Sequence, residues 1–156
     1  MAIITLNNNS LSSVTSLPAG VGGKVLQVVR TSTTTSFSTT STSFDSTNCS
    51  ATITPSSTSS KIVGFAQGMM YQSNTNHESQ YVIFRDSTNL NGEVWSFGES
   101  NNTAAIFSPM TFSFHDAPSS TSALQYILKL KTSDVNNAVT FYRQQFMTLM
   151  EIAGWY

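Results

Sequence analysis

Two pairs of neighbouring residues place an imidazole beside a carboxylate: His77 precedes Glu78, and His115 precedes Asp116. Such a pair could transfer a proton, but adjacent residues on a β-strand point to opposite faces, so neither pair is automatically a hydrogen-bonded dyad. The two histidines could instead gather on the axis of a trimer as a metal or anion site. We favour the simpler interpretation, a solvated histidine on the surface or in a turn, and expect no metal and no cofactor.

Three carboxylates surround Trp95 in the sequence, namely Asp86, Glu93 and Glu99. Glycoside cleavage requires two carboxylates that face each other across a sugar, so polysaccharide hydrolysis is one interpretation of this cluster. The other is a set of solvated acids in turns, which we favour. The many serines lack a Gly-x-Ser-x-Gly motif, and a hydroxyl without a positioned base is not a nucleophile. We therefore expect no catalytic residues and no enzymatic activity.

Aromatic residues near Trp95 could form a platform for sugar recognition, or they could fill the core. Phe84 and Phe97 lie in strong strand patterns, which favours the core. The polar loops around these strands suit adaptable contacts better. The candidate contacts to a receptor or glycan are Asn74, Asn76, His77, Asn89, Asn91 and Trp95.

Charge is scarce in this chain of 156 residues, a length that suits one domain. Charged residues make up 10% of the sequence, compared with about 25% in an average soluble protein. No run reaches the roughly 18 apolar residues of a membrane-spanning helix. The net charge is -1 and the basic residues are scattered, so nucleic acid is not an expected partner. Weak repulsion between copies favours self-assembly.

Residues 31–60 are almost entirely serine and threonine, interrupted by Phe37, Phe44, Ile53 and Pro55. This pattern suits strands with one solvated face, and it implies a surface of neutral hydroxyl groups. Cys49 is the single cysteine, so an intrachain disulfide is excluded and the fold must be held by packing and strand pairing.

Residues 1–23 differ from the rest and end in a cluster of glycines, which marks a boundary before a domain of residues 24–156. The segment is either an opening strand and loop of the same domain or an extended arm that packs on a neighbour. It lacks the positive flank and apolar run of a secretory signal. The apolar residues with which such an arm would attach are Ile3, Ile4, Leu6, Leu11, Val14 and Leu17.

Hydrophobic residues alternate with a period of two from residue 24 onward, which predicts half-buried strands and almost no helix. Many short strands with polar turns, one of them at Asn91-Gly92, predict an all-β fold. We expect an antiparallel β-sandwich in jelly-roll or Greek-key order, whose last strand is buried on both faces. The expected strands span residues 24–31, 35–44, 51–54, 61–71, 80–85, 93–97, 110–115, 125–131, 139–142 and 146–152.

Several phrases resemble a family of short virion proteins and fibre termini from tailed bacteriophages, including marine and cyanobacterial phages. They begin at Pro18-Ala-Gly-Val-Gly-Gly-Lys-Val-Leu-Gln-Val-Val29, continue through residues 37–44, 51–62 and 116–126, and end at Thr148-Leu-Met-Glu-Ile152. Together these phrases span most of the chain, and they occur in the order expected for the family. Residues 78–102 and the ending Gly154-Trp-Tyr156 depart from the family pattern.

The resemblance implies a non-enzymatic structural protein of the virion, assembled in the host cytoplasm as a homotrimeric β-sandwich and exposed on the particle surface. We expect a capsid decoration or cement protein that contacts other virion proteins, such as the major capsid protein, through the N-terminal arm. The alternative is the tip of a tail fibre that recognises a host surface glycan. Because burial of two large rings is favourable, Trp155 and Tyr156 are expected at a subunit interface.

Overall fold

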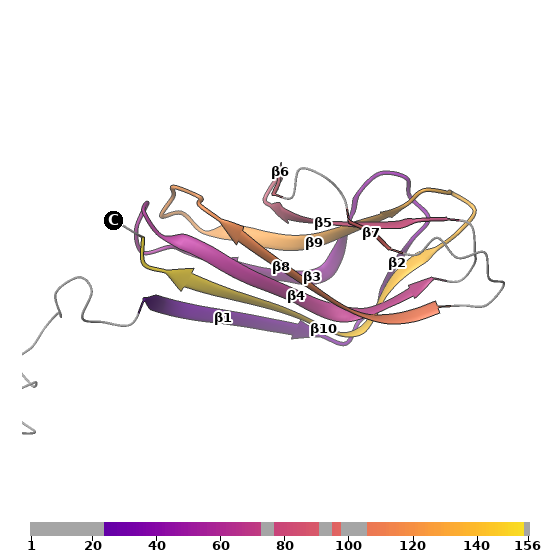
Figure 1. Ribbon diagram of the computed structural model, residues 1–156, viewed down its shortest axis with the longest axis horizontal. Coiled ribbons are helices and arrows are strands. Elements are labelled where there is room, and N and C mark those ends of the chain that lie inside the picture. The colour runs from indigo at the N-terminus through magenta and orange to yellow at the C-terminus, as the bar shows by residue number, and fades with distance from the viewer. Residues whose placement is uncertain (1–23, 73–76, 91–94, 98–105, 155–156) are drawn as a thin grey trace, which may run out of the picture.

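The computed structural model describes residues 24–72, 77–90, 95–97 and 106–154 (Figure 1). Ten strands of this part of the chain form two five-stranded antiparallel sheets. Sheet A has the order β1-β10-β4-β8, with β2 also paired to β10. Its strands are β1 (Val25–Thr33), β2 (Phe37–Thr39), β4 (Lys61–Gln72), β8 (Ile106–Asp116) and β10 (Val139–Ile152).

Sheet B has the order β3-β9-β5-β6, with β7 also paired to β5. Its strands are β3 (Asp45–Ile53), β5 (Ser79–Arg85), β6 (Thr88–Asn89), β7 (Trp95–Phe97) and β9 (Leu124–Thr132). Figure 1 shows β5 and β9 of this sheet above β1 and β10 of sheet A. The prediction of an all-β antiparallel sandwich is confirmed.

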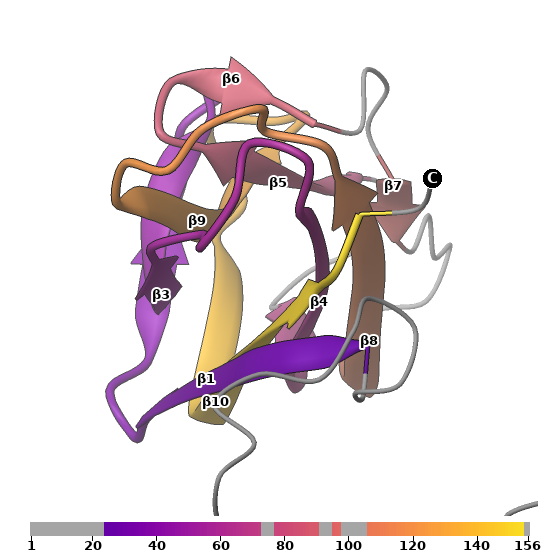
Figure 2. The same ribbon diagram turned by 90° about the vertical axis from the view of Figure 1, so that its left-hand side faces the viewer.

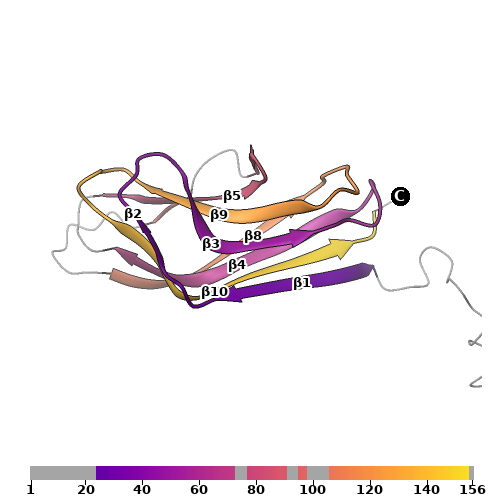
Figure 3. The same ribbon diagram turned by 180° about the vertical axis from the view of Figure 1, so that it is seen from behind.

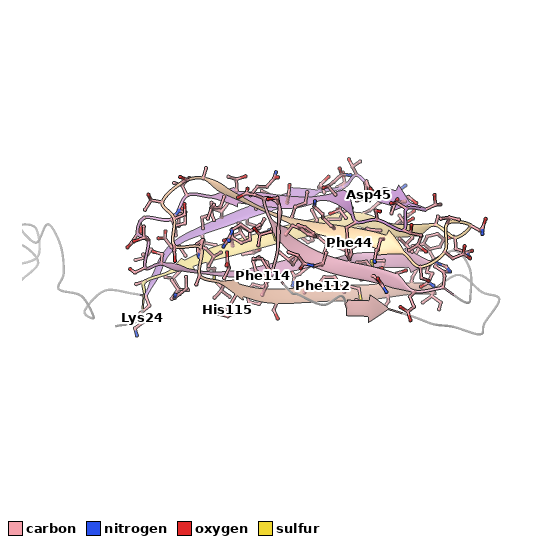
Figure 4. All side chains as sticks on the ribbon, turned by 90° about the horizontal axis from the view of Figure 1, so that it is seen from above. Lys24, Phe44, Asp45, Phe112, Phe114 and His115 are labelled. Atoms are coloured by element: carbon pink, nitrogen blue, oxygen red, sulfur yellow. The ribbon has the colours of Figure 1, made fainter. Side chains whose placement is uncertain are left out.

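Alternation of side chains along each strand explains why the two sheets stack. On β4, Ile62, Ala66 and Met70 are fully buried between the sheets, whereas the alternate residues Val63, Phe65, Gln67, Met69 and Tyr71 point away from the core. Sheet B contributes Tyr81, Ile83 and Leu128 to the same core, whereas Phe112 and Phe114 come from β8 of sheet A and lie in succession along it (Figure 4).

Two glycines of β4 make room for aromatic rings. A Cβ atom on Gly64 would overlap the ring of Phe114, and one on Gly68 would overlap the ring of Phe141. Close packing of these rings over the backbone therefore requires glycine at both positions.

Strands β1 and β8 are the opposite edges of sheet A (Figure 2). Along the first edge, β1 runs beside β3 of sheet B (Figure 3). Gln27 Nε2 donates to the Thr54 carbonyl at 2.7 Å, and Thr31 Oγ1 donates to the Ser50 carbonyl at 2.5 Å. These side-chain hydrogen bonds close the sandwich at the β1 edge.

The Ser/Thr-rich segment differs from the strand predicted over residues 35–44, because only β2 is extended there. The backbone N–H of Ser41 donates to Thr39 Oγ1 at 2.9 Å, and that of Ser43 donates to Ser41 Oγ at 3.0 Å. Such local bonds compete with strand pairing and divert the chain into turns. Strand β3 starts at Asp45, well before the predicted start at residue 51.

Strand β10 joins two segments that the sequence predicts as separate strands. Its pairing with β4 shifts register between Tyr142 and Phe146, and Gln144 has a φ of 59° there, so the interruption is a β-bulge inside one strand. Beyond the bulge, Met147 and Leu149 are fully buried and alternate with half-buried residues, so only one face of β10 lies in the core. The prediction of burial on both faces is confirmed for Val139, Thr140 and Phe141, and it is wrong beyond the bulge.

Candidate interaction surface

The side of sheet A that faces away from sheet B presents apolar side chains from β1, β10, β4 and β8, with polar side chains between them. The strand register determines which side chains are neighbours on this side. For example, Val28 of β1 is paired with Met150 of β10, which is paired in turn with Val63 of β4. We call the following side chains the outer face of sheet A: Val28, Arg30, Ser32, Val63, Phe65, Gln67, Met69, Tyr71, Phe107, Pro109, Thr111, Ser113, His115, Tyr142, Phe146, Thr148 and Met150.

Large apolar side chains on this surface are exposed to an unusual extent. Val28 is 57% exposed, Phe107 is 55% exposed and Met69 is 39% exposed. Val25 and Leu26 continue the exposed apolar surface around the start of β1. In the described part of the chain, the only other large hydrophobic residue exposed to this degree is Val135. The strand register places Val28 near one end of sheet A and Met69 with Phe107 near the other. Exposed apolar groups of this kind are typical of an interaction site.

Three aromatic rings cluster at one end of the outer face of sheet A. The ring centroids of Tyr71 and Phe107 lie 4.8 Å apart, and those of Phe107 and Tyr142 lie 5.9 Å apart. The tilted and edge-on geometries are those that aromatic pairs prefer. The three rings thus form one aromatic cluster on this surface.

Positive charge on this surface is stacked on aromatic rings. The Arg30 guanidinium lies 4.4 Å from the ring centroid of Phe146, and that of Arg143 lies 5.5 Å from the ring centroid of Tyr142. The outer face of sheet A contains no carboxylate. Its partner is therefore expected to be apolar, neutral or acidic.

A shallow groove of about 470 Å³ lies beside the bulge of β10. The bulge places Arg143 and Gln144 at its rim, whereas the next residue, Gln145, turns inward and donates to the Thr35 and Phe141 carbonyls at 2.9 Å. The groove thus combines apolar walls with amide and guanidinium groups. It is lined by Gln67, Gly68, Met69, Pro109, Met110, Thr111, Tyr142, Arg143, Gln144 and Phe146.

The outer face of sheet B is built differently, because lysine side chains cover its apolar residues. The Lys129 ammonium lies 4.2 Å from the ring centroid of Phe84, and that of Lys131 lies 4.8 Å from the ring centroid of Phe44. Val82 of β5, which is paired with Lys129 of β9, is only 1% exposed. The aliphatic stems of the lysines shield the apolar surface of sheet B, and their ammonium groups remain in solvent. Sheet A therefore exposes more apolar surface than sheet B.

The buried carboxylate of Glu151 fastens the loop between β3 and β4 to sheet A. Its Oε1 accepts hydrogen bonds from Ser56 N at 2.7 Å and from the Ser56 and Ser60 hydroxyls at 2.6 Å each, and Gln27 Nε2 donates to Oε2 at 2.6 Å. Burial opposes ionisation of this carboxyl, but these hydrogen bonds outweigh it and lower its pKa to about 2. The Ser56 and Ser60 hydroxyls satisfy the Glu151 carboxylate, so its role is structural.

The predicted imidazole and carboxylate pairs are not dyads in the structure. His115 points from the outer face of sheet A, whereas Asp116 bonds to Arg85 of sheet B. His77 is 1% exposed, so the expectation that it is solvated and open to a receptor was wrong. It follows β4 and lies next to Gln72, whose Nε2 donates to the His77 carbonyl at 2.6 Å. Among the described residues, neither ring nitrogen of His77 has a hydrogen-bond partner.

The two histidines do not meet within one copy. His77 follows the last residue of β4, whereas His115 is paired with Val63 near its start. Nine residues of strand between Val63 and Gln72 correspond to roughly 30 Å. Among the described residues, no group of three or more histidine, cysteine or acidic side chains is placed to hold a metal. In the same part of the chain, no helix has the length and hydropathy to cross a bilayer.

The remaining candidate contacts are only partly placed. Asn89 is half-buried at the end of β6, and Trp95 starts β7 opposite Tyr81 of β5. Outside the described residues are Asn74, Asn76 and Asn91, the Asn91-Gly92 turn, the arm residues Ile3, Ile4, Leu6, Leu11, Val14 and Leu17, and the C-terminal Trp155 and Tyr156. Their proposed roles stay predictions.

The carboxylates around Trp95 are likewise only partly placed. Asp86 is exposed at the turn after β5, where it has a φ of 52° and its Oδ1 accepts a hydrogen bond from Gln125 N at 3.0 Å. Glu93 and Glu99 lie outside the described residues. Asp86 therefore has a structural role in a tight turn.

Sequence reasoning missed the outer face of sheet A as a candidate site. The signal was present in the alternation of Val63, Phe65 and Met69 with the core residues of β4, because it makes both faces of that strand apolar. A strand with two apolar faces indicates burial on both sides.

No family model matches this sequence, and no curated protein matches it. The fold is similar to solved structures of the VP2 protein of infectious bursal disease virus. A D431N mutant of VP2 in T=1 particles has 16% sequence identity and a TM-score of 0.42 over 83% of this chain and 37% of that chain. A VP2 subviral particle has 15% identity and a TM-score of 0.43 over 82% of this chain and 38% of that chain. The chain thus spans little more than a third of the length of these proteins.

Proposed function

We propose that this chain is a non-enzymatic structural protein of a tailed-bacteriophage virion that decorates or cements the capsid. The observation that carries the proposal is the outer face of sheet A, which leaves Val28, Met69 and Phe107 exposed on one side of the sandwich. A protein that functions alone gains nothing from such a surface, whereas a protein of an assembled particle can bury it. The ordered sequence resemblance to phage virion proteins supplies the kind of particle.

The arm of residues 1–23 would fasten the sandwich to the particle. It contains no charged residue, and it joins the domain at Lys24, directly before the exposed start of β1. In the proposed arrangement the arm contacts the major capsid protein, and three copies of the sandwich stand on the particle surface.

Quantitative staining of purified particles tests this function. A copy number comparable with that of the major capsid protein supports decoration of the capsid. A copy number comparable with that of tail proteins contradicts it and supports the fibre-tip alternative. Absence of the chain from purified particles rejects both.

The groove beside the bulge of β10 favours that alternative, a fibre tip that recognises a host surface glycan. Aromatic and apolar walls with amide and guanidinium groups at the rim are suited to a sugar. Binding of purified host polysaccharide that is lost in Gln144→Ala supports this function. Release of oligosaccharides from the same polysaccharide would contradict the non-enzymatic role.

A further inference from the structure

We infer that the outer face of sheet A packs against a second copy of this chain. The first reason is the contrast between the two sheets. Lysine stems cover the apolar residues of sheet B, whereas Val28, Met69 and Phe107 of sheet A have no comparable cover among the described residues. The inference deepens the proposed function, on which it rests only for the particle in which the copies assemble.

The size of the surface matches what a stable interface needs. Four strands at a spacing of about 4.8 Å and eleven residues with a rise of about 3.3 Å give a face of roughly 19 Å by 36 Å, or about 700 Å². A specific interface buries about 800 Å² per partner. Val25 and Leu26 at the start of β1 extend the apolar surface beyond the face itself, so the available area reaches this range.

The charge distribution permits two copies to meet there. The two inner strands of the face, β4 and β10, contribute Val63, Phe65 and Met150, which carry no charge. Arg30 stands over the ring of Phe146, and stacked guanidinium groups are weakly hydrated and enriched at interfaces. With a net charge of -1, the chain also has little long-range repulsion between copies.

Sedimentation velocity of the purified full chain over a range of concentrations tests this inference. We expect the mass of at least two copies of the 16.9 kDa chain. The double variant Val28→Asp/Met69→Asp should raise the concentration needed for assembly by at least roughly tenfold, because it buries two carboxylates in the contact. Both residues are exposed in the single copy, so the fold itself should persist by circular dichroism.

Val135→Asp is the matched control. Val135 is 60% exposed, close to the 57% of Val28, but it lies in the turn between β9 and β10 and not on the outer face of sheet A. This variant should assemble like the wild type. A monomeric wild type, assembly of the double variant at wild-type concentrations, or an equal effect of Val135→Asp would each overturn the inference.

The result can be separated from that of the proposed function. A monomer in solution that is nevertheless found in purified particles overturns only the contact between copies. An oligomer that depends on Val28 and Met69 but is absent from particles overturns only the virion role.

Discussion

Arg85 of β5 and Asp116 of β8 connect the two sheets, because Nη1 of Arg85 lies 2.7 Å from Oδ2 and 2.8 Å from Oδ1 of Asp116. The Tyr126 hydroxyl of β9 donates to the same Oδ2 at 2.7 Å. The Arg85 and Asp116 side chains are 22% and 10% exposed, so the pair is largely shielded from solvent. This cluster secures one end of the sandwich, as the Glu151 cluster secures the loop between β3 and β4.

Asp116→Asn should lower the free energy of unfolding by about 1–3 kcal/mol, because it leaves the shielded guanidinium of Arg85 without its counter-charge. Tyr126→Phe removes one hydrogen bond to the same carboxylate and should cost about 1 kcal/mol. Urea denaturation followed by circular dichroism measures both. The interpretation fails if Asp116→Asn is no less stable than Tyr126→Phe.

Stability should fall in acid through Glu151. The pKa of this carboxyl is about 2 in the folded chain, against an ordinary value of 4.5, because hydrogen bonds from serine and glutamine outweigh the effect of burial. The difference contributes ~3 kcal/mol, which is fully present above pH 4.5 and is lost as the pH falls towards 2.

The comparison with Glu151→Gln isolates this contribution. The variant should be less stable than the wild type near neutral pH and should show a flatter dependence of unfolding free energy on pH between 4.5 and 2. Ser60→Ala removes one donor and should produce a smaller change in the same direction. An unchanged pH profile in Glu151→Gln would exclude this carboxylate as the source.

Cys49 should be protected from alkylation in the folded protein. Burial raises the pKa of its thiol to about 12, although a backbone hydrogen bond involving Gln67 partly opposes the shift. The thiol also donates to the Phe146 carbonyl at 3.3 Å. Iodoacetamide labelling should therefore be slow in buffer and rapid in guanidinium chloride. Equal labelling rates would show that the two sheets separate readily around β3 and β10.

Gly68→Ala should destabilise the fold by about 1–3 kcal/mol, since the added methyl group overlaps the ring of Phe141. In a Phe141→Leu background the same substitution should cost clearly less, because the smaller side chain leaves room. Thermal unfolding of the four chains of this cycle measures the coupling. Strict additivity would mean that the two residues do not compete for the same space.

Deletion of residues 1–17 tests the role proposed for the arm. The described sandwich starts at β1, so the shortened chain should keep its β-sheet circular dichroism and its oligomeric mass. It should not join the particle when it replaces the full chain during phage growth. Incorporation at the wild-type level would refute the fastening role.

Most strands could be predicted from the sequence because alternation of apolar and polar residues is a local property. The prediction for residues 61–71 differs from β4 by one residue, and that for residues 80–85 differs from β5 by one residue. The antiparallel sandwich followed from the number of such strands and from the absence of helical periodicity.

Hydrogen bonds that involve side chains were not predictable in the same way. Threonine and serine favour strands, yet Thr39 and Ser41 bind the following backbone and end β2 early. The bulge of β10 likewise depends on Gln145, which turns inward to bond to carbonyls of β10 and of the chain before β2.

The sequence by itself determined the class of fold and a surface poor in charge, because composition and periodicity act residue by residue. Only the tertiary structure decided which apolar residues remain uncovered. Val63 and Ile62 are equally apolar neighbours, but Ile62 faces sheet B and Val63 faces away from it. It also decided that His77 is buried, since burial depends on which strands stack above a residue and not on its own polarity.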